Sequence, residues 1–140
     1  MEKEFVPYAL ALRLKALGFD EPCFGYYHID LEEDKVLLFD DYEYFMEGIE
    51  FSCNAPTFSQ VFRWFRENHR MFHEVFIDTE PTVEEPDKLE FSFLILHMVG
   101  TEHMHTDKKQ RYTTYEEAEL ACLNKLIEIV EGAEAKTINI

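Results

Sequence analysis

The chain has 140 residues, of which 46% are hydrophobic and 15% aromatic, and this composition favours a folded domain and excludes general disorder. Its 29 acidic and 13 basic side chains give a net charge of −16, which disfavours binding to nucleic acid and to anionic membranes. Three cysteines without a paired spacing predict reduced thiols, and we expect neither a signal peptide nor a membrane span, so the sequence predicts a cytoplasmic protein.

The first predicted element is a helix over residues 6–18. Pro7 suits the first turn of a helix, where its missing N–H is not needed, and Gly18 suits the helix end. Leu10 and Leu14 share one face with Leu17, so this face is expected to be buried.

Two strands are predicted next, over residues 23–30 and 35–40, with an acidic turn between them. Residues 41–56 show no clear period. We interpret them as an irregular connection, rich in acidic and aromatic side chains, and place Cys53 in a loop.

A second helix is predicted from Thr57, a suitable N-cap that follows a proline. Its apolar side chains recur at i, i+3, i+4 and i+7, which is typical of a buried stripe, and they comprise Phe58, Val61, Phe62, Phe65 and His69, with Phe72 beyond. The opposite face carries Arg63, Arg66 and Arg70, and Trp64 lies on its flank.

Strands are predicted over residues 72–78 and 89–99, separated by a polar loop with two prolines, and a weaker strand over residues 103–112. A last helix begins at Thr114, which forms a capping-box pattern with Glu117, and its broad apolar arc contains Ala118, Cys122, Leu126, Ile129 and Val130. Gly132 is expected to end this helix.

The predicted order is therefore α-β-β-α-β-β-(β)-α, which favours an α+β class with a mainly antiparallel sheet of about four to five strands and about three helices. We predict one domain over residues 1–140. Its helix-strands-helix core covers 57–131, and 132–140 is expected to form a loose tail.

The stretches "APTFSQVFRWFREN", "TYEEAELACLNKLIEIV" and "LKALGFDEPCFGYY" resemble a family of short acidic proteins from Bacteroides-type gut bacteria, many of them apparently from prophages or other mobile elements. These stretches cover about a third of the chain. The family has no established activity, so the resemblance implies a mobile-element accessory context and neither a function nor a set of site residues.

A looser resemblance concerns element order. Helix, strands and helix across residues 57–131 are similar to the double-stranded-RNA-binding domain, which grips phosphates with lysines on its last helix. Here the corresponding helix begins "YEEAE", whose acids repel phosphates, so the activity is not expected even where the topology is shared.

Arg63, Arg66 and Arg70, with Trp64 beside them, are the candidate partner-binding residues, because guanidinium groups grip carboxylates or phosphates and Trp is a frequent interface anchor. The alternative is a solvated face that pairs with the chain's own acids. His97, His103 and His105 are weak candidates for metal ligands, against an alternative of exposed histidines in a turn and an edge strand.

No phosphate-binding loop, dinucleotide fingerprint or nucleophile elbow is present, and Cys53 has no adjacent base, so neither catalytic residues nor a cofactor are predicted. The first hypothesis is a non-enzymatic protein that binds another protein and neither nucleic acid nor membranes. One alternative is an acidic nucleic-acid mimic that inhibits a basic enzyme through Asp40, Asp41 and Glu43. The other is a small metal-dependent enzyme that uses the region from His97 to His105.

Overall fold

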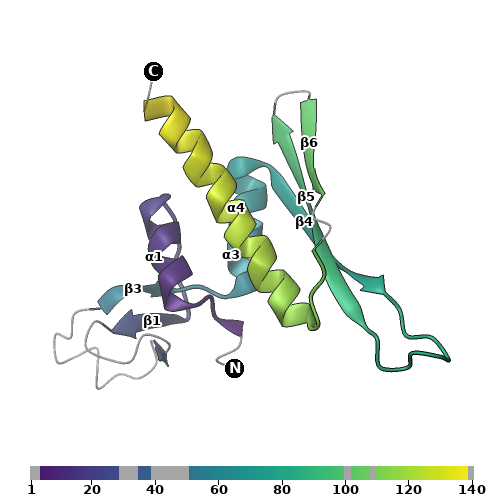
Figure 1. The fold of residues 1–140 in the computed structure, drawn as a ribbon. Coiled ribbons are helices and arrows are strands. Elements are labelled where there is room, and N and C mark those ends of the chain that lie inside the picture. Colours follow the sequence, from purple (N-terminus) through teal and green to yellow (C-terminus); the bar gives the residue numbers. More distant parts are fainter. Residues whose placement is uncertain (1–3, 29–34, 39–50, 100–101, 108–109, 139–140) are drawn as a thin grey trace. The chain divides into compact units, whose positions relative to one another are not determined.

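A computed structural model describes residues 4–28, 35–38, 51–99, 102–107 and 110–138 (Figure 1). The chain forms two compact units, Met1–Val61 and Phe62–Ile140. In the described residues each unit contains one three-stranded antiparallel sheet. The predicted α+β class is confirmed, but the strands are divided between two sheets instead of joined in one.

Helix α1 of the first unit spans Tyr8–Ala16 and confirms the predicted first helix. Pro7 is its N-cap, and the chain leaves the helix through Gly18 at a φ of +101°, a conformation that glycine adopts without steric cost. The backbone N–H of Gly18 donates to the carbonyl of Lys15, which satisfies one of the carbonyl groups left over at the helix end.

The sheet of the first unit has the order β2-β1-β3, formed by Gly25–His28 (β1), Val36–Leu38 (β2) and Phe51–Ala55 (β3). Strands β1 and β2 fall inside the two predicted strands. Strand β3 shows that our prediction for residues 41–56 was wrong in part, because we expected this stretch to be irregular. Its sequence "FSCNA" does alternate apolar and polar residues, but over only five residues, and pairing with β1 is what establishes it as a strand.

The core of the first unit forms between α1 and this sheet. Buried side chains of Ala11, Tyr27, Cys53 and Ala55 pack together with Phe5. The Tyr27 hydroxyl donates a hydrogen bond to the Val6 carbonyl oxygen, so the only polar atom of this buried ring has a partner. Cys53 is thus a core residue of β3 and not a loop residue.

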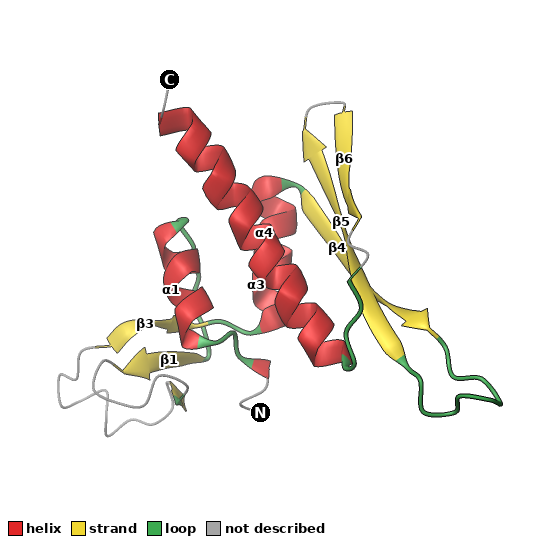
Figure 2. Cartoon of the chain, in the orientation of Figure 1, coloured by secondary structure: helices red, strands yellow, loops and turns green. Residues whose placement is uncertain are grey.

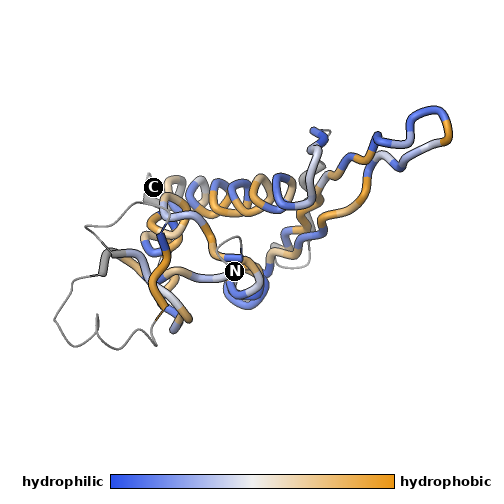
Figure 3. Tube along the Cα trace, turned by 90° about the horizontal axis from the view of Figure 1, so that it is seen from below, coloured by the Kyte–Doolittle hydropathy of each residue, from blue (hydrophilic) through white to orange (hydrophobic). Residues whose placement is uncertain are grey.

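The second unit is built on the sheet β4-β5-β6, formed by Met71–Thr79, Glu90–Val99 and Glu102–Asp107. Helices α3 (Phe58–His69) and α4 (Tyr115–Ile138) lie on the same side of it (Figure 2). The β4–β5 hairpin ends in a mostly hydrophilic loop, as predicted (Figure 3). The weak third strand that we predicted over residues 103–112 is present as β6, which ends at Asp107.

The two faces of this sheet differ in burial. Several positions that face the helices are buried, among them Met71, Phe93 and Ile95, whereas Ile77 towards the end of β4 is exposed. The alternate positions form the open face, where Phe72 is 41% exposed. Phe72 therefore does not continue the buried stripe of α3, as the helical spacing predicted, because β4 has already begun and strand alternation turns its side chain away from the helices.

Helix α4 begins as predicted, since the backbone N–H of Glu117 donates to the Thr114 hydroxyl at 3.1 Å. Its predicted end at Gly132 is wrong. The helix runs through Gly132 to Ile138, so the described part of the expected loose tail is helical. Gly132 does not have the positive φ of a helix-terminating glycine, and a helix tolerates one internal glycine at a cost of about 1 kcal/mol.

None of the helices in the described ranges combines the length and the apolar composition that crossing a bilayer requires.

Candidate functional site

The exposed side of α3 carries the predicted arginines. Val61, Phe62 and Phe65 are buried on one side of the helix, which confirms the aromatic stripe. Arg63 and Arg66 are exposed, and because Arg66 follows Phe62 by four residues it lies on the flank of the buried side and not opposite it, where the sequence had placed it. Two guanidinium groups are therefore presented to solvent from a helix whose position is determined by its buried rings.

Trp64 does not belong to this exposed surface. Only 6% of its surface is accessible, and its ring makes T-shaped contacts with Phe65 and His69 at centroid distances of 5.0 and 4.8 Å. The sequence placed Trp64 on the flank as a possible interface anchor. The structure buries it, because removing a large indole from water is favourable and neighbouring rings are available.

Arg70 is exposed but lies outside the helix. Helix α3 ends at His69, and Arg70 adopts a φ of 52° in the turn into β4. Its carbonyl oxygen accepts a hydrogen bond of 3.0 Å from the N–H of Met98 on β5, which holds this turn against the sheet. The predicted stripe of three helical arginines thus consists of two helical residues and one turn residue.

We expect Arg70→Gly to raise the free energy of unfolding by about 0.5–1 kcal/mol, because a residue with a Cβ is strained at a positive φ and glycine is not. Arg63→Gly is the matched control, since it replaces the same type of side chain in the middle of helix α3. It should lower the free energy of unfolding by about 1 kcal/mol. Urea unfolding of both variants, followed by Trp64 fluorescence, measures the two effects. If Arg70→Gly lowered the free energy of unfolding, the prediction that Arg70 is strained at its positive φ would be wrong.

Next to these arginines, His73 of β4 stacks on Phe62 of α3, with ring centroids 3.6 Å apart and an interplanar angle of 13°. Burial, together with a smaller effect of the nearby positive charge of Arg66, lowers the pKa of His73 from 6.5 to about 4. Arg66 therefore lies close to the first half of β4, and His73 is neutral at pH 7.

The low pKa of His73 predicts a loss of stability in acid. The pKa of His73 is lower in the folded chain than in the unfolded chain, so between pH 6.5 and 4 the unfolded chain binds a proton that the folded chain does not. The free energy of unfolding is therefore unaffected by His73 above pH 6.5 and falls as the pH drops from 6.5 towards 4. His73→Gln should flatten this part of the stability profile, measured by urea unfolding at several pH values. An NMR titration midpoint for His73 above pH 6 would contradict the prediction.

The histidine candidates are not brought together by register. His97 of β5 pairs with Met104, whereas His103 and His105 of β6 pair with Met98 and Leu96. Because successive strand positions belong to opposite faces, the register position of His97 lies on the other face from those of the β6 histidines. In the portion of the chain that the structure describes, no three His, Cys, Asp or Glu residues are arranged to hold a metal ion.

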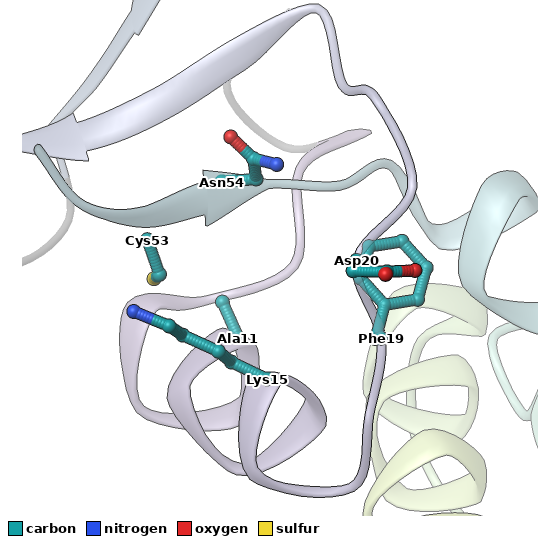
Figure 4. Close-up of a pocket in the computed structure, with 6 residues that line it drawn as sticks. All are labelled: Ala11, Lys15, Phe19, Asp20, Cys53 and Asn54. Carbon is teal, nitrogen blue, oxygen red and sulfur yellow. The ribbon is translucent and has the colours of Figure 1, made fainter.

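A cavity of about 150 Å³ lies in the first unit between α1 and β3 (Figure 4). Its lining consists of Ala11, Lys15, Phe19, Asp20, Cys53 and Asn54. The sequence analysis did not find this site, and no local signal marks it, because α1 and β3 meet only through the fold. The cavity is lined by the side chains of Lys15, Asp20 and Asn54 together with apolar groups, and its volume is below that of typical ligand pockets, about 300–1,000 Å³.

The thiol in this cavity is not a nucleophile at neutral pH. Burial raises the pKa of Cys53 above 9.0, and the charge of Lys15 opposes this only in part. Burial likewise raises the pKa of Cys23 to about 11 and that of Cys122 to about 12. The raised pKa values favour the protonated form of all three thiols at neutral pH.

The second unit has the predicted order of a helix, three antiparallel strands and a helix. Its last helix presents exposed Glu116 and Glu117 in the first turn. These carboxylates repel a phosphate backbone.

The proposed acidic mimic surface at Asp40, Asp41 and Glu43 lies outside the described residues. Comparison with known proteins adds no family, because no protein-family model, curated protein or solved structure matches the chain.

Proposed function

We propose that this chain is a non-enzymatic accessory protein that binds another protein, and that its second unit does so by capturing an acidic segment. The observation that carries this proposal is the exposure of Arg63 and Arg66 on one face of α3, with Arg70 directly beyond the helix. Guanidinium groups form bidentate hydrogen bonds with carboxylates, which makes such a cluster suited to acidic side chains.

The charge of the whole molecule favours a short acidic protein segment over a nucleic acid. A long polyanion would experience the field of the net charge of −16 together with that of the arginines. A short segment senses mainly the charges within a Debye length, about 8 Å at physiological ionic strength. The second unit also carries exposed acids at the start of α4, which adds to the repulsion of phosphates.

The compartment and genetic context are part of the same proposal. Cys23, Cys53 and Cys122 are free thiols, which supports a reducing environment such as the cytoplasm. The resemblance to mobile-element proteins supports an accessory role.

Peptide binding tests the proposed function. We expect a fluorescein-labelled octapeptide of alternating Glu and Val to bind the full chain in an anisotropy titration, and the corresponding Lys and Val peptide not to bind. Arg63→Gln combined with Arg66→Gln should weaken binding about tenfold or more, because two charge-assisted contacts are lost.

The matched control is Lys88→Gln combined with Lys125→Gln, which removes the same charge from other parts of the second unit and should leave binding nearly unchanged. Equal binding of acidic and basic peptides would refute the proposal. So would unchanged affinity of the double arginine variant for the acidic peptide.

A further inference from the structure

We propose that the acidic segment binds as an additional strand on the outer edge of β4, with its acidic side chains on the helix side of the sheet and apolar side chains on the open side. This inference rests on the proposed function and specifies how the partner binds. It predicts a ligand with acidic and apolar residues in alternation, in an extended conformation.

The first step is the edge itself. The sheet order β4-β5-β6 places β4 at one end, and in the described residues it forms a ladder with β5 alone. An edge strand presents backbone N–H and C=O groups that an extended peptide can pair with. Strand β4 has nine residues, and its pairing with β5 is regular from Met71 to Ile77. It contains neither lysine nor proline, the residues that commonly protect an edge from such pairing.

The second step concerns the helix side of this edge. Phe62 stacks on His73, so α3 lies over β4 at this point. Arg66 follows Phe62 by one helical turn and lies close enough to His73 to affect its titration, and Arg63 is exposed on the same side of α3 as Arg66. Side chains of an added strand that point towards the helices therefore approach positive charge, and carboxylates are the complementary groups.

The third step concerns the open side. Phe72 is 41% exposed on this face and pairs with Leu96 of β5, and Phe76 is partly exposed and pairs with Ser92. Apolar side chains of an added strand would pack against these rings as cross-strand neighbours. Exposed Glu74 lies between the two phenylalanines along β4 and disfavours acids on this side.

The two sides together define a register. Because strand side chains alternate with a period of two, shifting the peptide by one residue would place its acids beside Glu74 and its apolar groups beside the arginines. Alternation is thus the sequence signature of the ligand, in contrast to a simple acidic run, which would satisfy the arginines but not the open face.

The experiment uses the full chain and N-methylated peptides. N-methylation removes one backbone donor without changing any side chain. We would methylate the alternating Glu and Val octapeptide either at the Glu amides or at the Val amides, because only one of these two sets faces β4. One methylated peptide should bind at least tenfold more weakly than the parent, and the other should bind with nearly the parent affinity. The parent should also slow hydrogen exchange of β4 amides.

Strand addition is overturned if the parent peptide binds and depends on Arg63 and Arg66, yet both methylated peptides bind equally and β4 exchange is unchanged. The proposed function survives that result. Strand addition is also overturned if a peptide of four Glu followed by four Val binds as tightly as the alternating peptide. If no acidic peptide binds at all, the proposed function and this inference fail together.

Discussion

Replacing Phe65 by alanine is expected to lower the free energy of unfolding by about 3–5 kcal/mol, the largest effect that we predict for a single substitution. Phe65 is fully buried on α3, and its ring contacts Trp64 and His69. Truncation removes the transfer free energy of the ring and leaves a cavity among neighbours that are themselves large and well packed. Urea unfolding, followed in parallel by Trp64 fluorescence and circular dichroism, measures the loss.

Glu67→Ala is the matched control for Phe65→Ala, because it lies on the same helix and is exposed. Its effect should stay within about 0.5 kcal/mol, as for most surface substitutions. A cost of less than 1 kcal/mol for Phe65→Ala would mean that α3 does not bury its aromatic stripe. The orientation of Arg63 and Arg66, and with it the proposed binding face, would then have no structural basis.

The second large effect is expected in the first unit, where Gly25→Ala should cost about 1–3 kcal/mol through overpacking. A Cβ at this position would lie 2.5 Å from Cγ1 of Val36 and 3.0 Å from the carbonyl oxygen of Leu37. The valine methyl can rotate, but the Leu37 oxygen belongs to the backbone of the paired strand β2. Urea unfolding by circular dichroism and hydrogen exchange of the β1 amides would measure the change.

Gly132→Ala provides the contrast to Gly25→Ala. No atom lies within 4 Å of a Cβ built at Gly132, which is inside α4, so alanine should stabilise the helix by up to about 1 kcal/mol. The same chemical change is thus expected to have opposite signs at two sites. Stabilisation by Gly25→Ala would show that β1 and β2 do not approach as closely as described.

Local signals predicted the helices well. The caps at Thr57 and Thr114 are confirmed by hydrogen bonds to the N–H groups of Gln60 and Glu117, at 3.2 and 3.1 Å. The buried stripe of α3 was visible because helical spacing gathers side chains from one short segment onto one face. These features depend on contacts within four residues, which a single sequence contains in full.

Features that depend on distant partners were missed. Strand β3 forms because β1 pairs with it, and the cavity beside Cys53 exists because β3 then meets α1. Trp64 is buried and Phe72 is exposed, although the helical spacing placed Trp64 on a flank and extended the core to Phe72. For β3 and the cavity the outcome depends on partners that are distant in sequence. Trp64 instead contacts Phe65 and His69 of its own helix, and Phe72 is exposed because β4 has already begun at Met71.

The amino-acid sequence alone determined the α+β class, the helix starts, the aromatic side of α3 and the outward direction of Arg63 and Arg66, since helix geometry and solvent preference act locally. Only the tertiary structure decided that the strands form two sheets, that Arg70 leaves the helix, and that Arg66 lies near His73 of the edge strand β4. The physical reason is that sheet pairing and side-chain burial are long-range interactions, whose partners are chosen when the chain folds.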